Sequence, residues 1–334
     1  MRAKKAAPSP PFVVTPAIVK LVAKICEHIG RAAAHPEYVK ALRLNRINRI
    51  RSIHGSLAIE GNALDQEQIT AILEGKRVIG PKRDILEARN ALAAYAKLKK
   101  WRPLSEASLL KAHGMLMTGV AHDAGRYRAG NVGVLKGKQV IHMAPPAKRT
   151  PLLMRDLFKW LKATDQHPLI ASSIFHYEFE FIHPFSDGNG RMGRLWQSAL
   201  LSKWSPLFEF IPVESLVHAN QRAYYQALQQ SARATDAAPF VEFMLKMILQ
   251  AVREPTPQVA PQVTPQVRAL LSALKGEMSL AELLGTLRLS DRKSFRERYL
   301  RPALKAGLIA MTQPHAPRSS VQRYRLTPQG KRRL

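Results

Sequence analysis

Apolar residues recur at intervals of three and four along most of the chain before residue 250. The clearest runs cover residues 18–29, 44–59 and 86–98. This spacing places the apolar side chains on one face of a helix, and it differs from the strict alternation of a half-buried strand. The pattern therefore predicts a mainly α body.

One segment departs from the helical pattern. Residues 130–146 contain two short β-capable runs, Val132–Leu135 and Gln139–His142, on either side of a Lys-Gly-Lys turn. Pro145 and Pro146 close the segment, and proline at that point ends regular strand pairing. The order of strand, tight turn and strand predicts a β-hairpin on an otherwise helical body.

The most evident boundary is the repeated Pro-Gln-Val of residues 255–267. Proline at this frequency removes backbone donors and prevents a continuous helix, so an extended, semi-rigid linker is expected. The predicted organisation is an N-terminal helical region over residues 1–84, a core over 85–254, this linker, and a separate module over 268–334.

The module after the linker contains two helical and two strand-like stretches. Ser279–Leu287 and Ser290–Leu304 are expected to be helices that begin at serine caps, and Leu308–Thr312 and Val321–Leu326 are expected to be strands. Helix, helix and hairpin in this order are typical of a winged helix-turn-helix module. Such modules bind DNA, and they also serve as protein docking units.

Basic residues are in large excess, since 52 Lys and Arg stand against 24 Asp and Glu, a formal net charge of +28. The excess is densest in residues 255–334, which hold 15 basic and 4 acidic side chains. Basic side chains would crowd the module's second helix and wing: Arg292, Lys293, Arg296, Arg298, Arg318, Arg323 and Arg325. This distribution favours contact of residues 268–334 with DNA or RNA over the simpler interpretation of a solvated basic surface.

The sequence contains no stretch that approaches the roughly 18 consecutive apolar residues of a membrane span, and its first residues lack the apolar segment of a secretory signal. Its single cysteine, Cys26, excludes an internal disulfide and lies in an apolar run, which favours burial over reactivity. A cytoplasmic protein with no membrane contact is expected.

Residues 181–196, FIHPFSDGNGRMGRLW, place one histidine, one aspartate, three glycines and two arginines between two helical stretches. A glycine-rich loop that opens a helix directs backbone N–H groups outward at the positive end of the helix dipole, where phosphate is the natural ligand. Arg191 and Arg194 are expected to share a face of that helix and to bind phosphate oxygens together. Asp187 is a candidate ligand for a divalent cation, and His183 can accept a proton near neutral pH.

Two other interpretations compete with an anion site. Gly188, Gly190 and Gly193 match the spacing of a dinucleotide-binding loop, with Glu209 about 20 residues further on. That fingerprint requires a preceding buried strand, whereas residues 172–185 have helical spacing, so the dinucleotide interpretation is rejected. A loop whose histidine and arginines only satisfy each other would leave this combination of residues unexplained.

The segment HPFSDGNGRMGR resembles the signature of the Fic family, His-Pro-Phe-x-Asp-Gly-Asn-Gly-Arg-x-x-Arg, at every specified position. GRYRAGNVGV, HYEFEFIHPF and AYYQAL also resemble the family's core, and the likeness covers most of residues 35–250. It implies a Fic helical bundle with a β-hairpin flap, followed here by the winged helix-turn-helix module. It also implies an enzyme that transfers a nucleotide monophosphate.

The resemblance implies a role for each residue of the signature. His183 would deprotonate a Ser, Thr or Tyr hydroxyl of a target protein, and that oxygen would attack the α-phosphate of ATP. Asp187 would hold Mg²⁺, and the phosphates would be bound by Gly188, Asn189, Gly190, Arg191 and Arg194. Tyr224 and Tyr225 resemble residues near the adenine, although Ala232 replaces an asparagine that some relatives carry. The flap that pins the target segment would consist of Val134, Leu135, Lys136, Gly137 and Val140.

Residues 56–62, SLAIEGN, resemble the family's inhibitory motif Ser-x-x-x-Glu-Gly. Ser56 and Glu60 are four residues apart and would face the same way on a helix, and Gly61 with Asn62 suits a left-handed helix end. The resemblance implies that Glu60 pairs with Arg194 and takes the guanidinium that would hold the γ-phosphate. Autoinhibition within one chain is therefore expected. Without the resemblance, a solvent-facing glutamate at a helix end explains the pattern.

Two other classes of function stay open at this stage. An enzyme of this fold could remove AMP, with Glu60 aligning a water, or transfer a different phosphate-containing group. Alternatively, the protein could be a DNA-binding regulator whose Fic body senses a nucleotide. Similar proteins are commonly homodimers, so a homodimer also stays open, and the sequence identifies neither the target protein nor the residue modified.

Overall fold

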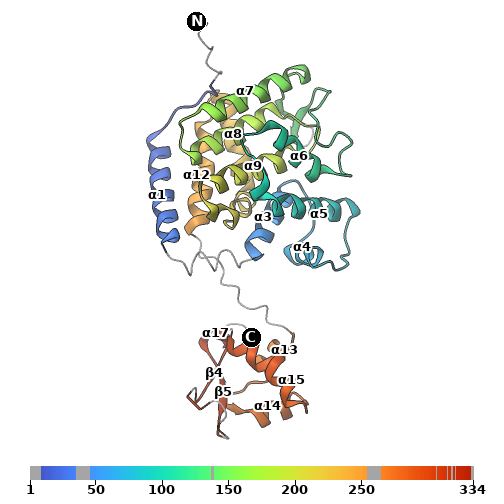
Figure 1. Cartoon of the computed structure of the whole chain (residues 1–334), viewed down its shortest axis with the longest axis vertical. Coiled ribbons are helices and arrows are strands. Elements are labelled where there is room, and N and C mark those ends of the chain that lie inside the picture. Colours follow the sequence, from blue (N-terminus) through green and yellow to red (C-terminus); the bar gives the residue numbers. More distant parts are fainter. Residues whose placement is uncertain are drawn as a thin grey trace. The chain divides into compact units, whose positions relative to one another are not determined.

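The chain divides into two compact units, Met1–Thr256 and Pro257–Leu334, each with its own apolar core (Figure 1). The computed structural model describes residues 9–34, 46–136, 139–253, 265–305, 307–313, 315–316, 319 and 321–331. Both units are mainly helical, which confirms the fold class expected from the spacing of apolar residues.

The first unit is a bundle of helices with one β-hairpin. Its α-helices are α1 (Pro16–Ala33), α3 (Arg46–Ile59), α4 (Gln66–Leu73), α5 (Lys82–Ala96), α6 (Glu106–Met117), α7 (Thr150–Ala163), α8 (Pro168–Ile182), α9 (Asn189–Trp204), α10 (Val213–Ala219), α11 (Gln221–Ala234) and α12 (Ala238–Arg253). Short 3₁₀ helices lie between them, namely η1 (Leu98–Lys100), η2 (Ala147–Arg149) and η3 (Pro206–Glu209). Strands β1 (Gly133–Lys136) and β2 (Gln139–Met143) pair antiparallel and form the predicted hairpin.

Several helices begin at polar caps that the sequence supplies. The hydroxyl of Thr15 accepts the N–H of Ile18 at 3.2 Å at the start of α1. Asp65 and Gln68 form a capping box at α4, and Ser105 caps α6. These side chains satisfy N–H groups that have no acceptor within their own helix, so they fix where each helix begins.

Helix α8 is enclosed by its neighbours, because it packs against α7, α9 and α12 (Figure 1). The stretch from Leu169 to Tyr177 is buried, and it contains no Asp, Glu, Lys or Arg. Ser172 and Ser173 donate to the carbonyl oxygen of Leu169 at 3.3 and 2.8 Å, so their buried hydroxyls are satisfied. Helix α8 therefore gives the loop that follows it a rigid base.

Helix α3 carries Ser56 and packs against α10, and Glu60 is the first residue after its end at Ile59. Gly55 permits the close approach, since a Cβ at this position would lie 2.6 Å from the carbonyl oxygen of Glu214. Leu57 is 2% exposed in the core of the unit. These contacts hold α3 in one register, in which the Ser56–Glu60 side faces α9.

The second unit contains the helices and strands expected of a winged helix-turn-helix module. Its elements are α13 (Pro265–Ala273), β3 (Met278–Ser279), α14 (Leu280–Thr286), α15 (Arg292–Phe295), the π-helical η4 (Arg296–Leu300), α16 (Arg301–Lys305), β4 (Ile309–Met311), β5 (Arg323–Leu326) and α17 (Pro328–Lys331). The sheet is antiparallel in the order β3–β5–β4. Leu270, Leu283, Phe295 and Leu308 are among the side chains of its apolar core.

Two features of the second unit differ from the sequence-based expectation. The extended linker was expected to reach residue 267, but α13 begins at Pro265 and Val267 is 3% exposed in the core. Proline suits the first turn of a helix, so the last Pro-Gln-Val repeat starts α13. Ser279 caps α14 as predicted, whereas α15 is capped by Asp291 and not Ser290, because the Asp291 carboxylate accepts two N–H groups of the first turn.

Some predicted features fall outside the described residues. These are residues 255–264 of the expected linker, Gly137 of the expected flap, the side chains of Val134, Leu135, Lys136 and Val140, and Arg318 of the expected wing. Among the helices that are described, none combines the length and the apolar character that crossing a bilayer requires.

Candidate active site

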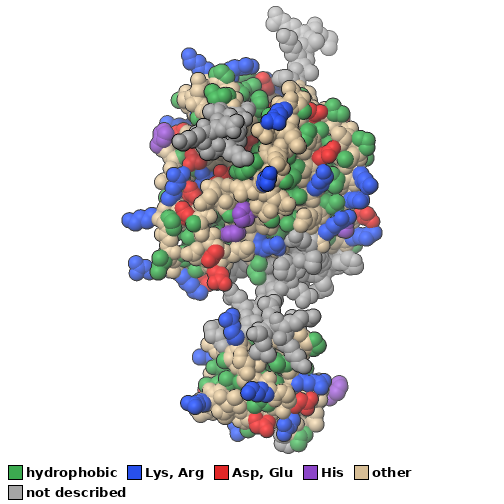
Figure 2. Space-filling view, turned by 180° about the vertical axis from the view of Figure 1, so that it is seen from behind, with side chains coloured by type: hydrophobic (Ala, Val, Ile, Leu, Met, Phe, Trp, Pro, Cys, Tyr) green, Lys and Arg blue, Asp and Glu red, His purple; other side chains and the backbone are tan. Residues whose placement is uncertain are grey.

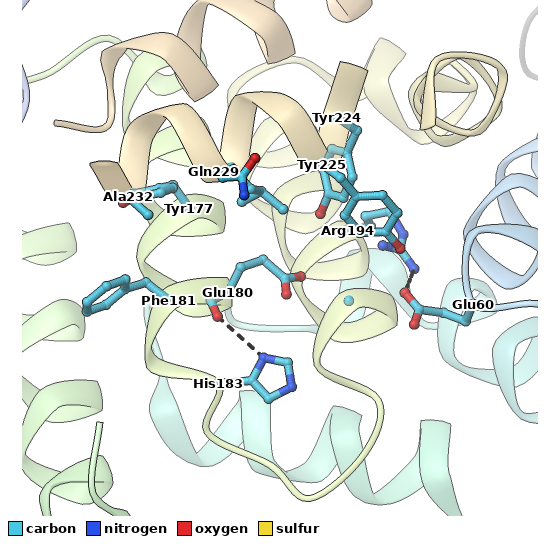
Figure 3. A pocket seen from close by; sticks show the side chains of 12 residues that line it. Glu60, Tyr177, Glu180, Phe181, His183, Arg194, Tyr224, Tyr225, Gln229 and Ala232 are labelled. Carbon is cyan, nitrogen blue, oxygen red and sulfur yellow. Dashed lines mark hydrogen bonds and ion pairs between the residues drawn. The ribbon is translucent and has the colours of Figure 1, made fainter. Parts of the chain in front are cut away.

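His183 lies where α8 ends. Its backbone adopts a left-handed conformation (φ 50°, ψ 61°), and its N–H donates to the carbonyl oxygen of Phe179 at 2.9 Å. Left-handed backbone is uncommon outside glycine and turns the chain sharply out of the helix. Nδ1 of the half-buried imidazole lies 3.4 Å from the carbonyl oxygen of Glu180, and the ring lines the same cavity as Arg194 (Figure 3).

The loop after His183 is braced from inside. Asn189 closes it with two hydrogen bonds of 2.9 Å, one from the N–H and one to the carbonyl oxygen of Phe185. Phe185 is fully buried and stacks on His113, with ring centroids 3.5 Å apart. His113 Nε2 lies 3.0 Å from the carbonyl oxygen of Asp187, and its Nδ1 accepts the N–H of Gly125. Burial lowers the pKa of His113, so this histidine is neutral and holds the loop in shape.

Helix α9 presents backbone donors to the loop. Gly188 is left-handed (φ 82°), and the first hydrogen bond of the helix runs from the N–H of Met192 to its carbonyl oxygen at 2.9 Å. The N–H groups of Asn189, Gly190 and Arg191 therefore have no acceptor within the helix, and they lie at the positive end of its dipole. A Cβ at Gly190 would collide with the carboxylate of Glu60, so in this structure that carboxylate occupies the space beside the helix start.

Arg194 and Glu60 form an ion pair at the edge of the cavity (Figure 3). Nη2 of Arg194 lies 2.7 Å from Oε1 of Glu60 and 2.9 Å from the carbonyl oxygen of Ser56, and Nε donates to the Ser56 hydroxyl at 3.1 Å. The Arg194 side chain is 2% exposed. Burial alone would lower the pKa of Arg194, but the negative groups around it, Glu60 first among them, together raise this pKa. The two segments that resemble the signature and the inhibitory motif therefore meet.

The Arg191 side chain is directed away from the cavity that Arg194 lines. Its Nη1 lies 2.9 Å from Glu87 and its Nη2 lies 2.8 Å from Oδ1 of Asp187, and the side chain is 5% exposed. Arg191 and Arg194 therefore have different partners in this structure, contrary to the shared orientation expected from helical spacing, while their binding of phosphate stays a prediction. The reason is Glu87, a buried carboxylate on α5 that draws Arg191 away from the cavity.

Asp187 is the carboxylate beside the start of α9. Its side chain is 39% exposed, and Arg83 contacts its Oδ2 at 2.8 Å while Arg191 contacts its Oδ1. No group of three or more potential metal ligands occurs among the described residues. Magnesium in nucleotide sites is commonly held by one or two carboxylates together with substrate phosphates, so an accessible carboxylate beside an anion site fits Mg²⁺.

The cavity has a volume of about 150 Å³ and extends from His183 and Arg194 between α8 and α11 (Figure 3). Side chains of both helices give it an apolar wall: Tyr177, Phe181, Tyr224, Tyr225, Leu228 and Ala232. Burial raises the pKa of Tyr224 well above its ordinary value, so its hydroxyl stays protonated beside His176 Nε2 at 3.1 Å. Both tyrosines singled out from the sequence thus line the cavity, as does Ala232.

Sequence reasoning missed two polar residues of the cavity. Gln229 comes three residues before Ala232 on α11 and brings a carboxamide to the wall. Glu180 comes three residues before His183, and this proximity in sequence is the only feature that could have identified it. Its side chain is 12% exposed. In Figure 3 its carboxylate points into the space between His183 and Arg194.

Comparison with known proteins agrees with this geometry. The Fic/DOC family model matches residues 103–201, and the model of the Filamentation induced by cAMP protein Fic-like, C-terminal domain, matches residues 265–327. A crystal structure of a Fic family protein from Desulfovibrio desulfuricans is 50% identical, covers 96% of this chain and 99% of that one, and superposes with a TM-score of 0.71.

Curated relatives carry the name protein adenylyltransferase Fic. The protein from Nematostella vectensis is 31% identical over 207 residues, which is 58% of this chain and 45% of that protein. The protein from Culex quinquefasciatus is 30% identical over 206 residues, 58% of this chain and 39% of that protein. The chain thus spans less than half the length of these relatives. With the near full-length match to the Desulfovibrio protein, these likenesses show that the chain belongs to the Fic/DOC family.

Proposed function

We propose that the protein is a protein adenylyltransferase, which transfers AMP from ATP to a Ser, Thr or Tyr hydroxyl of a target protein. One observation carries the proposal. His183, the start of α9 at Gly190, and Arg194 all line one cavity whose remaining wall is mostly apolar and aromatic. This arrangement suits a nucleotide, because the phosphates require donors and the base and ribose require an apolar slot.

The proposed reaction uses His183 as the general base. Its imidazole accepts the proton of the target hydroxyl, and the hydroxyl oxygen forms a bond to the α-phosphorus of ATP. The bond from that phosphorus to the oxygen bridging to the β-phosphate breaks, pyrophosphate leaves, and AMP remains on the target as a phosphodiester. The imidazole lies at the end of α8 within 3.4 Å of the carbonyl oxygen of Glu180, and it is only partly buried, so a target hydroxyl can approach it.

The start of α9 would stabilise the negative charge that develops on the transferred phosphate. The N–H groups of Asn189 and Gly190 point outward from the helix, and donors fixed before the reaction cost no reorganisation. Asp187 would hold Mg²⁺, which neutralises phosphate charge when it is bound with ATP. Because Arg83 and Arg191 now occupy both oxygens of Asp187, metal binding would have to displace at least one of these contacts.

Glu60 would act as a brake on this reaction. Its carboxylate is bonded to Arg194 and lies against Gly190, which is the place that the γ-phosphate and its neighbours would need. The nucleotide would bind less tightly or with its α-phosphate displaced while Glu60 stays there. The same carboxylate could instead align a water that removes AMP from a modified protein.

Labelled ATP distinguishes these reactions. The full-length protein with Glu60→Gly is incubated with a cell lysate and with ATP that carries its label on either the α- or the γ-phosphate. Transfer of AMP predicts that the label which His183→Ala abolishes comes only from the α-position. Label from the γ-position that His183→Ala abolishes would indicate phosphoryl transfer by this protein, and release of AMP from a previously modified protein, without new labelling, would indicate removal; either result would overturn the proposal.

A second candidate function, contact with DNA, concerns the second unit alone. Along α15, η4 and α16 the side chains of Arg292, Lys293, Arg296, Arg298 and Arg301 are exposed, and none has an ion-pair partner among the described residues. Phe295 and Leu300 are buried beneath them, so the basic side chains lie on the outer side of this helical stretch. Figure 2 shows Lys and Arg side chains on the surface of both units.

The salt dependence of DNA binding tests this second function. A fluorescent duplex is titrated with the full-length protein and with a variant that carries both Arg292→Ser and Arg296→Ser. Binding through these side chains predicts that the variant has a lower affinity and a salt slope smaller by roughly 1 for each phosphate that it no longer neutralises. Arg268→Ser with Arg288→Ser, two exposed arginines elsewhere in the unit, is the matched control. Equal losses of DNA affinity in the two double variants would contradict binding through the basic side chains of α15 and η4.

A further inference from the structure

One buried arginine joins the backbone at His183, where α8 ends, to the base of the β1–β2 hairpin. Arg128 is 3% exposed, and its guanidinium donates to four backbone carbonyl oxygens. Nε lies 2.7 Å from the oxygen of His183, Nη1 lies 2.9 Å from that of Gly130, and Nη2 lies 2.6 and 3.3 Å from those of Pro145 and Ile182. No carboxylate contacts it among the described residues.

These carbonyls belong to two separate structures. Ile182 and His183 form the C-terminal end of α8, where the last carbonyls of a helix have no partner of their own and the dipole favours a cation. Gly130 and Pro145 flank the hairpin, since one precedes β1 and the other follows β2. A single planar guanidinium therefore spans the backbone of His183 and both sides of the hairpin base.

The hairpin base is itself one piece. The N–H of Ala144 donates to the carbonyl oxygen of Val132 at 3.3 Å, and the side chain of Asn131 accepts the N–H of Ala147 at 2.9 Å. The N–H of Arg128 also donates to the carbonyl oxygen of Pro184 at 3.0 Å. Any displacement of the hairpin base is therefore transmitted through residue 128 to the chain on both sides of His183.

Burying a charged side chain at this position has a large desolvation cost. Burial lowers the pKa of Arg128, which means that its cation loses hydration without gaining a carboxylate. Four carbonyls and the end of a helix dipole compensate for part of that cost. An ammonium could not copy this arrangement, because Arg presents five donors in a fixed plane and Lys presents three donors on one atom.

We propose that Arg128 is a positioning residue, which sets the distance between the His183 imidazole and a target hydroxyl held by the hairpin. The inference rests on the proposed transfer of AMP and on a target segment that pairs with the hairpin. Arg128 is absent from the wall of the nucleotide cavity. Its loss should therefore alter the rate of transfer and leave nucleotide binding unchanged, because a misplacement of about 1 Å can cost about 100-fold in rate.

The test uses Arg128→Lys in the full-length protein that carries Glu60→Gly. Arg126→Lys is the matched control, because Arg126 is an exposed arginine two residues earlier in the same loop. Three quantities are measured for each protein: the affinity for ATP, the rate of AMP transfer per ATP-binding site, and amide hydrogen exchange of peptides that cover residues 129–133 and 183–186. Expressing the rate per ATP-binding site removes any contribution from unfolded protein.

Arg128→Lys is expected to lower the transfer rate by about 10- to 100-fold, to change ATP affinity by less than about twofold, and to speed exchange in both peptides. Arg126→Lys should change none of these quantities. A transfer rate equal to that of the parent, a rate loss that only follows weaker ATP binding, or unchanged exchange would each overturn the proposal. If the parent itself transfers no AMP, the proposed function fails, while the exchange data still decide whether Arg128 couples the two segments.

Discussion

The sharpest prediction concerns the charge of Glu60. Glu60→Gln keeps the size of the side chain and removes its charge, whereas Glu60→Gly also empties the space beside Gly190. The carboxylate is 32% exposed and lies 2.7 Å from a guanidinium that is 2% exposed. Solvent therefore reaches the carboxylate but is largely excluded from the guanidinium. Two further hydrogen bonds from Arg194 to Ser56 keep the guanidinium in place when the carboxylate is removed.

The expected increase in the rate of AMP transfer follows from this geometry. A hydrogen bond to a charged group contributes about 1.5–3 kcal/mol, and about 1.4 kcal/mol corresponds to a factor of ten. If ATP must break this contact to reach Arg194, Glu60→Gln should raise the rate of AMP transfer at low ATP concentration by about 10- to 100-fold. Glu60→Gly should raise it further, because the phosphates can then also approach the N–H groups at the start of α9.

The assay follows initial rates of self-labelling from ATP labelled at the α-phosphate, over a range of ATP concentrations. Glu67→Gln on α4 is the control, since Glu67 is exposed and lies outside the cavity wall. Both Glu60 variants labelling at the rate of the unmodified protein, with the same dependence on ATP, would refute the brake. An increase with Glu60→Gly alone would show that the bulk of the side chain matters more than its charge.

Three other substitutions give measurable outcomes. His183→Ala should abolish transfer while ATP affinity, measured by calorimetry, changes little. Arg83→Ala should lower the Mg²⁺ concentration for half-maximal rate by a few-fold, because it releases Oδ2 of Asp187; Arg89→Ala, an exposed change on the same helix, should not. Burial raises the pKa of Glu178 to about 7, above its ordinary value of 4.5, so this carboxyl stabilises the fold below about pH 4.5 and loses that contribution as the pH rises toward 7. Glu178→Gln should therefore remove that decline and raise the unfolding free energy at pH 8 by about 3 kcal/mol in denaturant titrations.

Local sequence was sufficient for the hairpin, for the strongly periodic helices and for much of the loop that follows α8, but not for α13. The loop from His183 to Arg194 is dictated by neighbours in sequence, because Asn189 bonds to Phe185 and Gly188 supplies the left-handed residue before α9. The contact between Glu60 and Arg194 spans 134 residues, and it was expected only because two short motifs resemble one family. Periodicity alone gave no sign of it.

The remaining side chains of the site could not be predicted, because their partners come from distant elements. His113 lies on α6, 74 residues before Asp187, and no pattern around it indicates a contact with the loop. Glu87 on α5 redirects Arg191, which helical spacing alone had placed beside Arg194. In both cases tertiary contacts decide between orientations that the helix itself allows.

Both arginines of α9 form ion pairs that a nucleotide would have to break in order to bind. In this structure two carboxylates near the start of α9 are neutralised by arginines of that helix, since Glu60 bonds to Arg194 and Asp187 bonds to Arg191. Binding of ATP with Mg²⁺ would exchange both partnerships at once: phosphate oxygens would replace Glu60 at Arg194, and the cation would replace an arginine at Asp187. Removal of Glu60 eliminates only the first of these two costs. A protein with Glu60→Gly and Arg83→Ala should therefore need less Mg²⁺ than one with Glu60→Gly alone, and an unchanged Mg²⁺ requirement would show that Asp187 does not hold the cation.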